Sequence, residues 1–232
     1  MQGRSIIPGI PVGDGKYGKM AAETEARWIP IAVSADILDG TVVPANLPSG
    51  PIAVWRSASG KLFANGDRCP HRGMRLSHGF VRGESLSCIY HGWRYGTDGA
   101  CQKIPAHPTV EPPKTINCTP FPVMEANGVV WCALERPTEE PLLFDGFEAL
   151  RSLVIAASCD AILHAGQGKT AEGAVSLELA GKSAFLVMNP YGPDEVFVAV
   201  LVNAGLCAAD RLAVSTAVEA LRRRAEAMED AA

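Results

Sequence analysis

Two short pairs of cysteine and histidine lie close together in the first half of the chain. The first pair, C-P-H, spans Cys69–His71, and the second, C-I-Y-H, spans Cys88–His91. Thiolate and imidazole groups at this spacing are typical of a metal site. Zinc modules usually open with two cysteines and close with two histidines, whereas here each arm supplies one of each. This asymmetry favours a two-metal cluster whose irons have different ligands.

The residues around these pairs carry a resemblance to a known family. The stretch from Cys69 reads C-P-H-R-G-M-R-L-S-H-G, and the stretch from Cys88 reads C-I-Y-H-G-W. They resemble the Rieske [2Fe–2S] motif in its oxygenase form, over roughly residues 26–135. The resemblance implies that Cys69 and Cys88 hold one iron of a [2Fe–2S] cluster and that His71 and His91 hold the other.

Respiratory-chain Rieske proteins are the nearest alternative. They carry two further cysteines that join the cluster loops by a disulfide, and Met74 and Tyr90 occupy those places here. This difference favours the oxygenase type. Rieske centres have potentials of about −150 to +300 mV, against about −400 mV for plant-type clusters. Without the disulfide, we expect a potential near the lower end of the Rieske range.

Several neighbours of the candidate ligands are expected to shape the cluster loops. Gly73 and Gly92 closely follow the two histidines and are expected to have positive φ, which lets backbone N–H groups point at sulfur. Trp93 is expected to pack against the base of the loops and exclude water. Arg72 is interpreted as a loop brace, with a docking charge as the alternative.

The composition excludes several functional classes. The chain has 232 residues, of which 47% are hydrophobic, so it can bury a core. Its net charge is −4, and no basic stripe indicates a nucleic-acid partner. Its apolar runs are shorter than the roughly 20 residues of a membrane helix, and the N-terminus lacks the apolar segment of a signal peptide. We therefore expect a cytoplasmic protein that binds neither nucleic acid nor membrane.

The cysteines outside the two pairs are not expected to form disulfides. The chain has seven cysteines, and an odd number argues against a disulfide framework. The five that are not candidate ligands are expected to be reduced and structural: Cys101, Cys118, Cys132, Cys159 and Cys207.

Three segments are expected along the chain. Residues 1–25 lack a clear hydrophobic period and are interpreted as a flexible arm, in which Met20 is a candidate native start. An arm that exchanges onto a neighbouring subunit is the functional alternative. Residues 26–140 are expected to form the Rieske-like β domain, and residues 141–232 a second, shortened domain.

The β domain shows short strands separated by turn residues. A hairpin over Gly83 is expected to bring the Cys88 loop beside the Cys69 loop. The expected elements are a strand over 28–37, a loop containing Pro44, Pro48 and Pro51, paired strands 52–56 and 61–64, paired strands 80–81 and 85–87, and paired strands 121–124 and 129–134 joined by Asn127-Gly128.

The second domain is expected to contain three strands and a long terminal helix. The strands are predicted at Val175–Leu179, Ala184–Met188 and Val196–Val202, the last of them central because it is apolar on both faces. The helix is predicted to begin near Asp210 as its N-cap. Its apolar stripe is expected to be Val214, Val218, Leu221, Ala225 and Met228. The predicted fold class is α+β, mostly antiparallel β, and this end of the chain resembles a shortened helix-grip domain of Rieske oxygenases.

The resemblance implies a second metal site that the sequence does not complete. Rieske oxygenases hold a mononuclear iron on two histidines and one carboxylate in this domain. His164 is the only histidine in residues 140–232, and Asp160 precedes it by four residues. Two ligands of three are present, so we expect no mononuclear iron. His164 is interpreted as an exposed or hydrogen-bonded loop residue.

A glycine-containing segment near His164 is interpreted as a false signal. Gly166–Thr170 reads G-Q-G-K-T and ends like a phosphate-binding P-loop. That motif requires a further glycine at position 163, which is Leu163. Nucleotide binding is therefore not expected, and Lys169 is interpreted as a solvated charge.

Two functions fit these features. The first is an electron-transfer protein or subunit that takes electrons from an NAD(P)H-linked reductase or a ferredoxin and delivers them to a partner's iron. The second is an oxygenase subunit, a hydroxylase or demethylase, whose companion chain supplies the mononuclear iron and the substrate pocket. A third hypothesis is a purely structural or regulatory subunit, and the complete set of cluster ligands argues against it. No catalytic residue is assigned.

Overall fold

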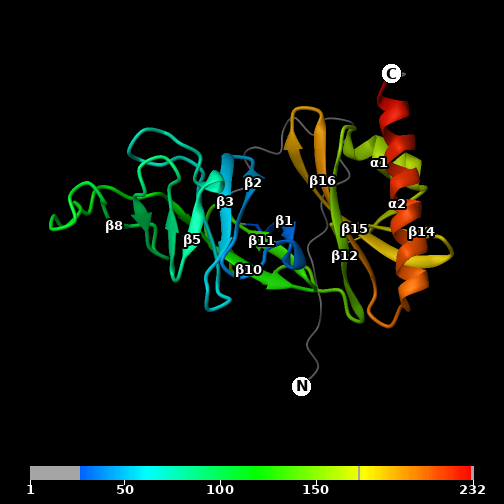
Figure 1. Cartoon of the computed structure of the whole chain (residues 1–232). Helices are drawn as coiled ribbons and strands as arrows, with labels where there is room; N and C mark the ends of the chain where they lie inside the picture. The colour runs from blue at the N-terminus through cyan, green and yellow to red at the C-terminus, as the bar shows by residue number, and fades with distance from the viewer. Residues whose placement is uncertain (1–26, 172, 231–232) are drawn as a thin grey trace. The chain divides into compact units, whose positions relative to one another are not determined.

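A computed structural model of the chain describes residues 27–171 and 173–230 (Figure 1). It consists mostly of antiparallel strands with two α-helices, which confirms the predicted fold class. The chain divides into two compact units between Pro141 and Leu142, one residue from the boundary predicted after residue 140. The arm predicted for residues 1–25 lies outside the described residues. Among the described helices, none combines the length and the apolar character needed to cross a membrane.

The first unit is formed by small antiparallel sheets. Their strand orders are β1-β11-β10, β2-β3-β4-β9 and β5-β6-β7-β8. The strands are β1 (Ile29–Val33), β2 (Val42–Leu47), β3 (Gly50–Arg56), β4 (Leu62–Gly66), β5 (Phe80–Arg82), β6 (Ser85–Ser87), β7 (Arg94–Tyr95), β8 (Cys101–Lys103), β9 (Pro120–Phe121), β10 (Val123–Ala126) and β11 (Val129–Cys132). Two 3₁₀ turns, η2 (Ser34–Asp36) and η3 (Leu76–His78), complete the unit.

Strand β3 contributes to two hydrophobic cores at once. Because successive side chains of a strand point to opposite faces, Ile52 and Val54 enter one core with β1 and β11. Ala53 and Trp55 enter a second core, which also contains the two candidate cysteines, Cys69 and Cys88. The candidate metal site is therefore fixed to the central strand of the unit through packed side chains.

The predicted hairpins are confirmed, and one predicted loop is wrong. β5 and β6 pair over Gly83, and β10 and β11 pair across Asn127-Gly128, where both residues have positive φ. Pro44 does not lie in a loop but in β2, opposite Ala53 of β3. β2 is an edge strand, where the missing N–H of proline leaves no ladder bond unmade. The first predicted strand is also shorter, because η2 follows β1.

Two backbone carbonyl groups lie so close to Gly79 that a side chain at this position should disturb the cluster hairpin. A Cβ atom at Gly79 would overlap the carbonyl oxygen of Ser87 and lie 2.8 Å from that of Leu76. Because backbone atoms cannot move aside easily, we expect Gly79→Ala to lower the free energy of unfolding by about 2–3 kcal/mol. Gly83→Ala is the matched control, since no atom lies within 4 Å, and its positive φ should cost only about 1 kcal/mol. Urea denaturation of both variants measures this difference, and equal losses would contradict the proposed crowding.

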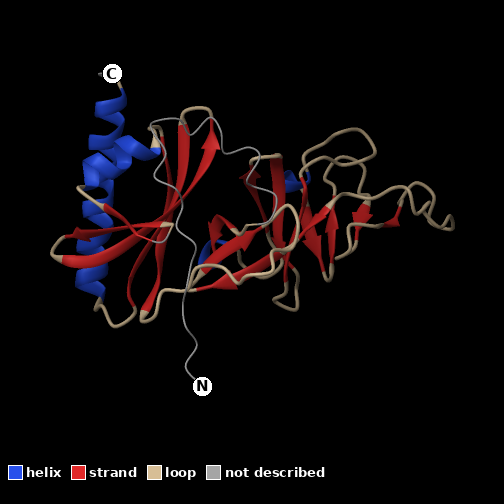
Figure 2. Cartoon of the chain, turned by 180° about the vertical axis from the view of Figure 1, so that it is seen from behind, coloured by secondary structure: helices blue, strands red, loops and turns tan. Residues whose placement is uncertain are grey.

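The second unit is a five-stranded antiparallel sheet with both helices on one side, as Figure 2 shows. The strand order is β12-β16-β15-β14-β13, so β16 is internal and its side chains are buried between its ends. The elements are β12 (Phe147–Ile155), α1 (Cys159–Gly166), β13 (Lys169–Ala171), β14 (Ala174–Leu179), β15 (Lys182–Gly192), β16 (Glu195–Asn203) and α2 (Ala208–Glu229).

The terminal helix differs from its prediction at both ends. Its apolar stripe is buried against the sheet from Val214 to Ala225, but Met228 is 47% exposed and does not belong to it. The helix begins at Ala208 with Cys207 as N-cap, so the predicted cap at Asp210 is wrong. Asp210 lies in the first turn instead, where its carboxylate pairs with Lys182 at 3.1 Å. The positive end of the helix dipole stabilises this negative charge.

Three elements of this unit were missed, β12, α1 and β13, and the last two explain the false P-loop signal. β12 pairs with β16 although Arg151 and Ser152 interrupt its apolar pattern. In helix α1, the Ser158 side chain accepts a hydrogen bond from the Ala161 N–H. Gln167 is the left-handed C-cap of α1. The G-Q-G-K-T segment therefore ends a helix and begins a strand, the reverse of a phosphate-binding loop.

Candidate functional site

The two cysteine loops have the same backbone hydrogen bonds. In loop 1 (residues 68–75), the Cys69 N–H donates to Met74 and the Gly73 N–H donates back to Cys69, both at 2.8 Å. In loop 2 (residues 88–93), the corresponding bonds join Cys88 to Trp93 at 2.9 Å and Gly92 to Cys88 at 3.0 Å.

Gly73 and Gly92 each have φ of 69°, which confirms the predicted left-handed positions. Each glycine lies four residues after its cysteine, in the same place in both loops. The loops are therefore structural repeats, although His71 and His91 occupy different places within them.

The candidate thiols lie inside and the candidate imidazoles lie outside. Cys69 and Cys88 are only 3% and 2% exposed. The rings of His71 and His91 lie 4.7 Å apart between centroids, with His71 half-buried and His91 exposed. A sulfur pair on the core side and an imidazole pair on the solvent side thus come together from separate loops.

Aromatic contacts take the place of a covalent link between the loops. The Trp93 ring of loop 2 stacks on His71 of loop 1, with centroids 4.3 Å apart and planes within 7°. Tyr90 lies against His91 at 4.0 Å. Trp93 therefore packs on a candidate ligand, and it also packs against the core beneath the loops, as predicted. The predicted brace is not Arg72 but Arg68, whose guanidinium donates to the Gly73 carbonyl at 3.1 Å.

The surroundings of the thiols are suited to a cation. Burial raises the pKa of the Cys88 thiol, backbone N–H groups of Tyr90 and His91 lower it, and the neighbouring Cys69 raises it again. Two adjacent buried thiolates would repel each other unless a positive charge lay between them. Burial is also the main cause that lowers the pKa of His71, followed by the neighbouring His91, and a neutral imidazole is the form that binds metal.

Tyr95 is a site residue that the sequence did not reveal. It is fully buried in β7, and its hydroxyl lies 3.0 Å from the Cys69 sulfur. Burial and then the Cys69 contact raise the pKa of Tyr95 well above its usual range, so the hydroxyl stays protonated. A protonated phenol beside a metal-bound thiolate would act as the hydrogen-bond donor.

This contact predicts a measurable shift in reduction potential. A hydrogen bond to a cluster sulfur stabilises the reduced, more negative state. We expect Tyr95→Phe to lower the midpoint potential by about 30–60 mV, since 59 mV corresponds to a tenfold change for one electron. A redox titration followed by visible absorbance measures the shift. Tyr90→Phe is the control, because the Tyr90 side chain is 54% exposed and its hydroxyl makes no hydrogen bond within the described part of the chain. An unchanged potential in Tyr95→Phe would remove this residue from the site.

Asp67 anchors loop 1 from beneath. Its side chain is fully buried and accepts hydrogen bonds from the Ser77 N–H at 2.6 Å and the Ser77 hydroxyl at 2.8 Å. The Arg75 guanidinium lies 3.8 Å away. Asp67 therefore joins the start of loop 1 to η3, and no motif in the sequence indicates this role.

The other histidines do not join the site. His78 and His107 are exposed. His164 lies on helix α1 rather than in a loop, and its Nδ1 is 2.9 Å from the Asp160 carbonyl. Among the described residues, no three His, Cys, Asp or Glu side chains gather to hold one metal ion. The absence of a mononuclear iron stays a prediction.

The remaining cysteines are free thiols. All of the five except Cys207 are buried, which fits the predicted structural role. Burial raises the pKa of Cys118 and of Cys132 to about 12, so both are neutral near pH 7.

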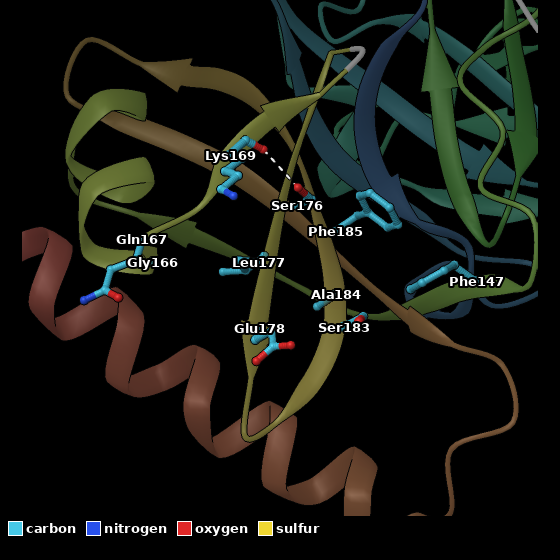
Figure 3. Close-up of a pocket in the computed structure, with 10 residues that line it drawn as sticks. All are labelled: Phe147, Gly166, Gln167, Lys169, Ser176, Leu177, Glu178, Ser183, Ala184 and Phe185. Atoms are coloured by element: carbon cyan, nitrogen blue, oxygen red, sulfur yellow. Dashed lines mark hydrogen bonds between the residues drawn. The ribbon is translucent and has the colours of Figure 1, made fainter.

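The second unit contains a cavity of about 590 Å³ at the edge of its sheet (Figure 3). Residues from the false P-loop segment, including Lys169, form part of its wall. The Ser176 hydroxyl donates to the Lys169 carbonyl at 3.2 Å. The described residues that line this cavity include the carboxylate of Glu178 but no histidine or cysteine, so the two imidazoles of a mononuclear iron site are not found among them.

Comparison with known proteins decides what the cysteine loops are. Residues 27–119 match the pattern of the Rieske [2Fe-2S] domain. The chain carries a Rieske [2Fe–2S] domain. Oxidoreductase NdmD of Pseudomonas putida is 39% identical to the chain over 147 residues, which cover 59% of this chain and 25% of NdmD. The 3-chlorobenzoate-3,4-dioxygenase oxygenase subunit of Comamonas testosteroni is 35% identical over 119 residues, 50% of this chain and 28% of the relative. The chain thus spans about a quarter of the length of each.

The fold likeness extends beyond the Rieske domain. The crystal structure of apo dicamba monooxygenase superposes with a TM-score of 0.73 and 15% identity, covering 90% of this chain and 86% of that one. NdmA of Pseudomonas putida CBB5 superposes with a TM-score of 0.67 and 19% identity, covering 88% of this chain and 81% of that one. At these identities the likeness concerns the fold, and it includes the sheet and terminal helix of the second unit.

The residues of the Rieske domain fit the cluster that such a domain implies. Each iron of a Rieske cluster takes two protein ligands, so a group of three ligands is not required. Two buried thiols and two outward imidazoles meet in loops of matching conformation, with the Tyr95 hydroxyl directed at one sulfur. This donor set is the one that a mixed thiolate and imidazole [2Fe–2S] cluster uses.

Proposed function

We propose that the chain is a one-electron carrier of an oxygenase system, with Cys69 and Cys88 holding one iron and His71 and His91 the other. The observation that carries this proposal is the pairing of loops 1 and 2, which places two thiols on the core side and two imidazoles on the solvent side. A [2Fe–2S] cluster held there accepts and releases one electron. The imidazole edge faces solvent, so a partner can approach it directly.

The surrounding residues perform the supporting tasks. Trp93 holds the His71 ring by stacking, and the Tyr95 hydroxyl donates to Cys69. Asp67 and Arg68 keep loop 1 in place through backbone hydrogen bonds. A rigid environment of this kind lowers the reorganisation energy of electron transfer, because the loops need not move when the charge of the cluster changes.

The electron source in this proposal is an NAD(P)H-linked reductase or a ferredoxin. The relative named an oxidoreductase, NdmD, supports an electron-transfer role for the shared segment. We place the protein in the cytoplasm, on the sequence argument alone.

A second function rests on a different observation. The second unit has the fold found in dicamba monooxygenase, and the matched 3-chlorobenzoate relative is an oxygenase subunit. The chain would then be an oxygenase subunit whose companion chain provides the mononuclear iron and the substrate pocket. Asp160 and His164 are too few to hold that iron within this chain.

Oxygen consumption tests the carrier function against oxygen activation by this chain itself. The cluster-loaded protein is mixed with NADPH, a ferredoxin reductase and a plant-type ferredoxin, and oxygen uptake is followed with an electrode. A carrier is expected to be reduced by one electron per chain and then to show only slow autoxidation. Rapid NADPH-dependent oxygen uptake by this chain alone, with hydroxylated product, would refute the carrier function.

A further inference from the structure

Two large apolar side chains of loop 2 are exposed. Ile89 is 57% exposed and Tyr90 is 54% exposed. They precede His91 directly, and the Tyr90 ring touches the His91 ring. Folding normally removes such side chains from water when a core is available. We refer to Ile89 and Tyr90 as the apolar tip.

Three arginines of loop 1 form a second feature, which we call the basic rim: Arg68, Arg72 and Arg75. All three are exposed. Arg68 bonds only the Gly73 carbonyl, and no carboxylate lies within ion-pair distance of Arg68 or Arg72 among the described residues. Arg75 faces only the buried Asp67, at 3.8 Å. Most of the positive charge of the basic rim is therefore not compensated by a neighbouring carboxylate.

The positive charge of the rim is not a property of the whole chain. Residues 68–103 contain six Lys or Arg and two Asp or Glu, in a chain whose net charge is −4. One of the two acids, Glu84, accepts hydrogen bonds from Ser59. The loops that hold the candidate ligands thus lie in the basic part of an acidic chain. Such local charge steers the approach of an oppositely charged partner.

We propose that the apolar tip and the basic rim dock the acidic face of an electron-donor protein with a plant-type [2Fe–2S] cluster. This inference rests on the proposed function and names its partner. Plant-type clusters have lower potentials than Rieske centres, so the electron moves downhill. Carboxylates of the donor would meet the rim, while an apolar contact at the tip would exclude water beside His91.

The size of the surface suits a short-lived complex. Electron-transfer encounters bury small interfaces, and a few exposed apolar residues inside a charged border are sufficient for them. Charge complementarity at such a border acts mainly on association and on its dependence on salt. A donor that must leave after each electron is better served by this arrangement than by a large apolar interface.

Equilibrium binding tests the inference without any turnover. The oxidised, cluster-loaded protein is titrated calorimetrically with an oxidised plant-type ferredoxin at low and at high salt. We expect Arg72→Glu to weaken binding about tenfold at low ionic strength, and the difference to vanish near roughly 0.5 M salt because screening removes it. Ile89→Ser should weaken binding a few-fold at both salt concentrations, because an apolar contact is not screened.

The matched control lies on the other unit. Arg223 of α2 is also an exposed arginine, so Arg223→Glu makes the same charge change in the unit that contains none of the candidate ligands. We expect wild-type binding for this variant. Equal weakening by Arg72→Glu and Arg223→Glu would reduce the effect to net charge and overturn the docking surface. Binding that does not respond to salt, or no binding at any salt, would overturn it as well.

The two proposals fail in different ways. If the chain does not hold a Rieske cluster, the visible absorbance and the electron paramagnetic resonance (EPR) signal of the starting protein are absent before any ferredoxin is added. If only the docking surface is wrong, the cluster is present and dithionite reduces it normally, while the affinities fail to separate Arg72→Glu from Arg223→Glu.

Discussion

Replacement of His91 by cysteine is expected to lower the reduction potential of the Rieske centre by about 100–300 mV, given the gap between Rieske and plant-type clusters. The imidazole is neutral when it binds iron, whereas a thiolate adds a full negative charge. Because that charge opposes the arrival of an electron, the reduced state loses stability. His91 is exposed and its loop repeats the conformation of loop 1, so a smaller side chain should be accommodated. A spectroscopic redox titration measures the change.

The matched control for this variant is His78→Cys. His78 is an exposed histidine of the same unit that lies at the end of η3, and its replacement should leave the potential unaltered. If His91→Cys keeps both its cluster and the wild-type potential, His91 is not a ligand. If His78→Cys produces the larger shift, the ligand assignment has been made to the wrong histidine.

Replacement of Arg56 by methionine is expected to lower the free energy of unfolding by about 2–4 kcal/mol. The Arg56 guanidinium is buried and donates to the Ile37 carbonyl at 2.9 Å and to the Gly60 carbonyl at 3.0 Å. It also holds Glu125 at 2.7 and 3.2 Å and the Ser34 hydroxyl at 3.1 Å. Methionine fills similar space but removes the guanidinium donor from all of these acceptors, although Glu125 keeps the hydrogen bond from the Ser34 hydroxyl.

Chemical denaturation at pH 7 measures this loss. Arg136→Met is the control, because Arg136 is an exposed arginine of the same unit and should contribute less than about 0.5 kcal/mol. A loss below 1 kcal/mol in Arg56→Met, or an equal loss in the control, would contradict the role assigned to Arg56.

The same variant should be less sensitive to acid. The hydrogen bond from Arg56 lowers the pKa of Glu125, against the opposing effect of its burial. A carboxyl group whose pKa is lowered by folding stabilises the protein above its unfolded pKa, and this contribution is lost as pH falls through the folded pKa. The stability difference between wild type and Arg56→Met should therefore be greatest near neutral pH and shrink in acid.

The sequence predicts the cluster loops well because their chemistry is local. Spacing alone brings Cys69 and His71 into one loop and Cys88 and His91 into another, and Gly83 closes the hairpin that joins them. The turn at Asn127-Gly128 follows from the same local preferences. Positive φ at Gly73 and Gly92 could be anticipated for this reason.

Contacts between distant segments could not be predicted in this way. Tyr95 reaches the Cys69 sulfur only because β7 pairs with β6 and β8, and Asp67 becomes buried only when η3 packs above it. Pro44 enters a strand because β2 is at an edge. Arg151 lies within β12 because its side chain reaches Ser215 and Glu219 of α2, a pairing that no local pattern indicates.

Iron and acid-labile sulfide content, measured with the EPR spectrum of the dithionite-reduced protein, tests the mixed-ligand cluster most directly. Two irons and two sulfides per chain, with the low average g-value of a Rieske centre, are the predicted result. Zinc in place of iron, or a thiolate-only cluster signal, would contradict the assignment of His71 and His91. A third, tightly bound iron per chain would contradict the expectation that the mononuclear site is incomplete.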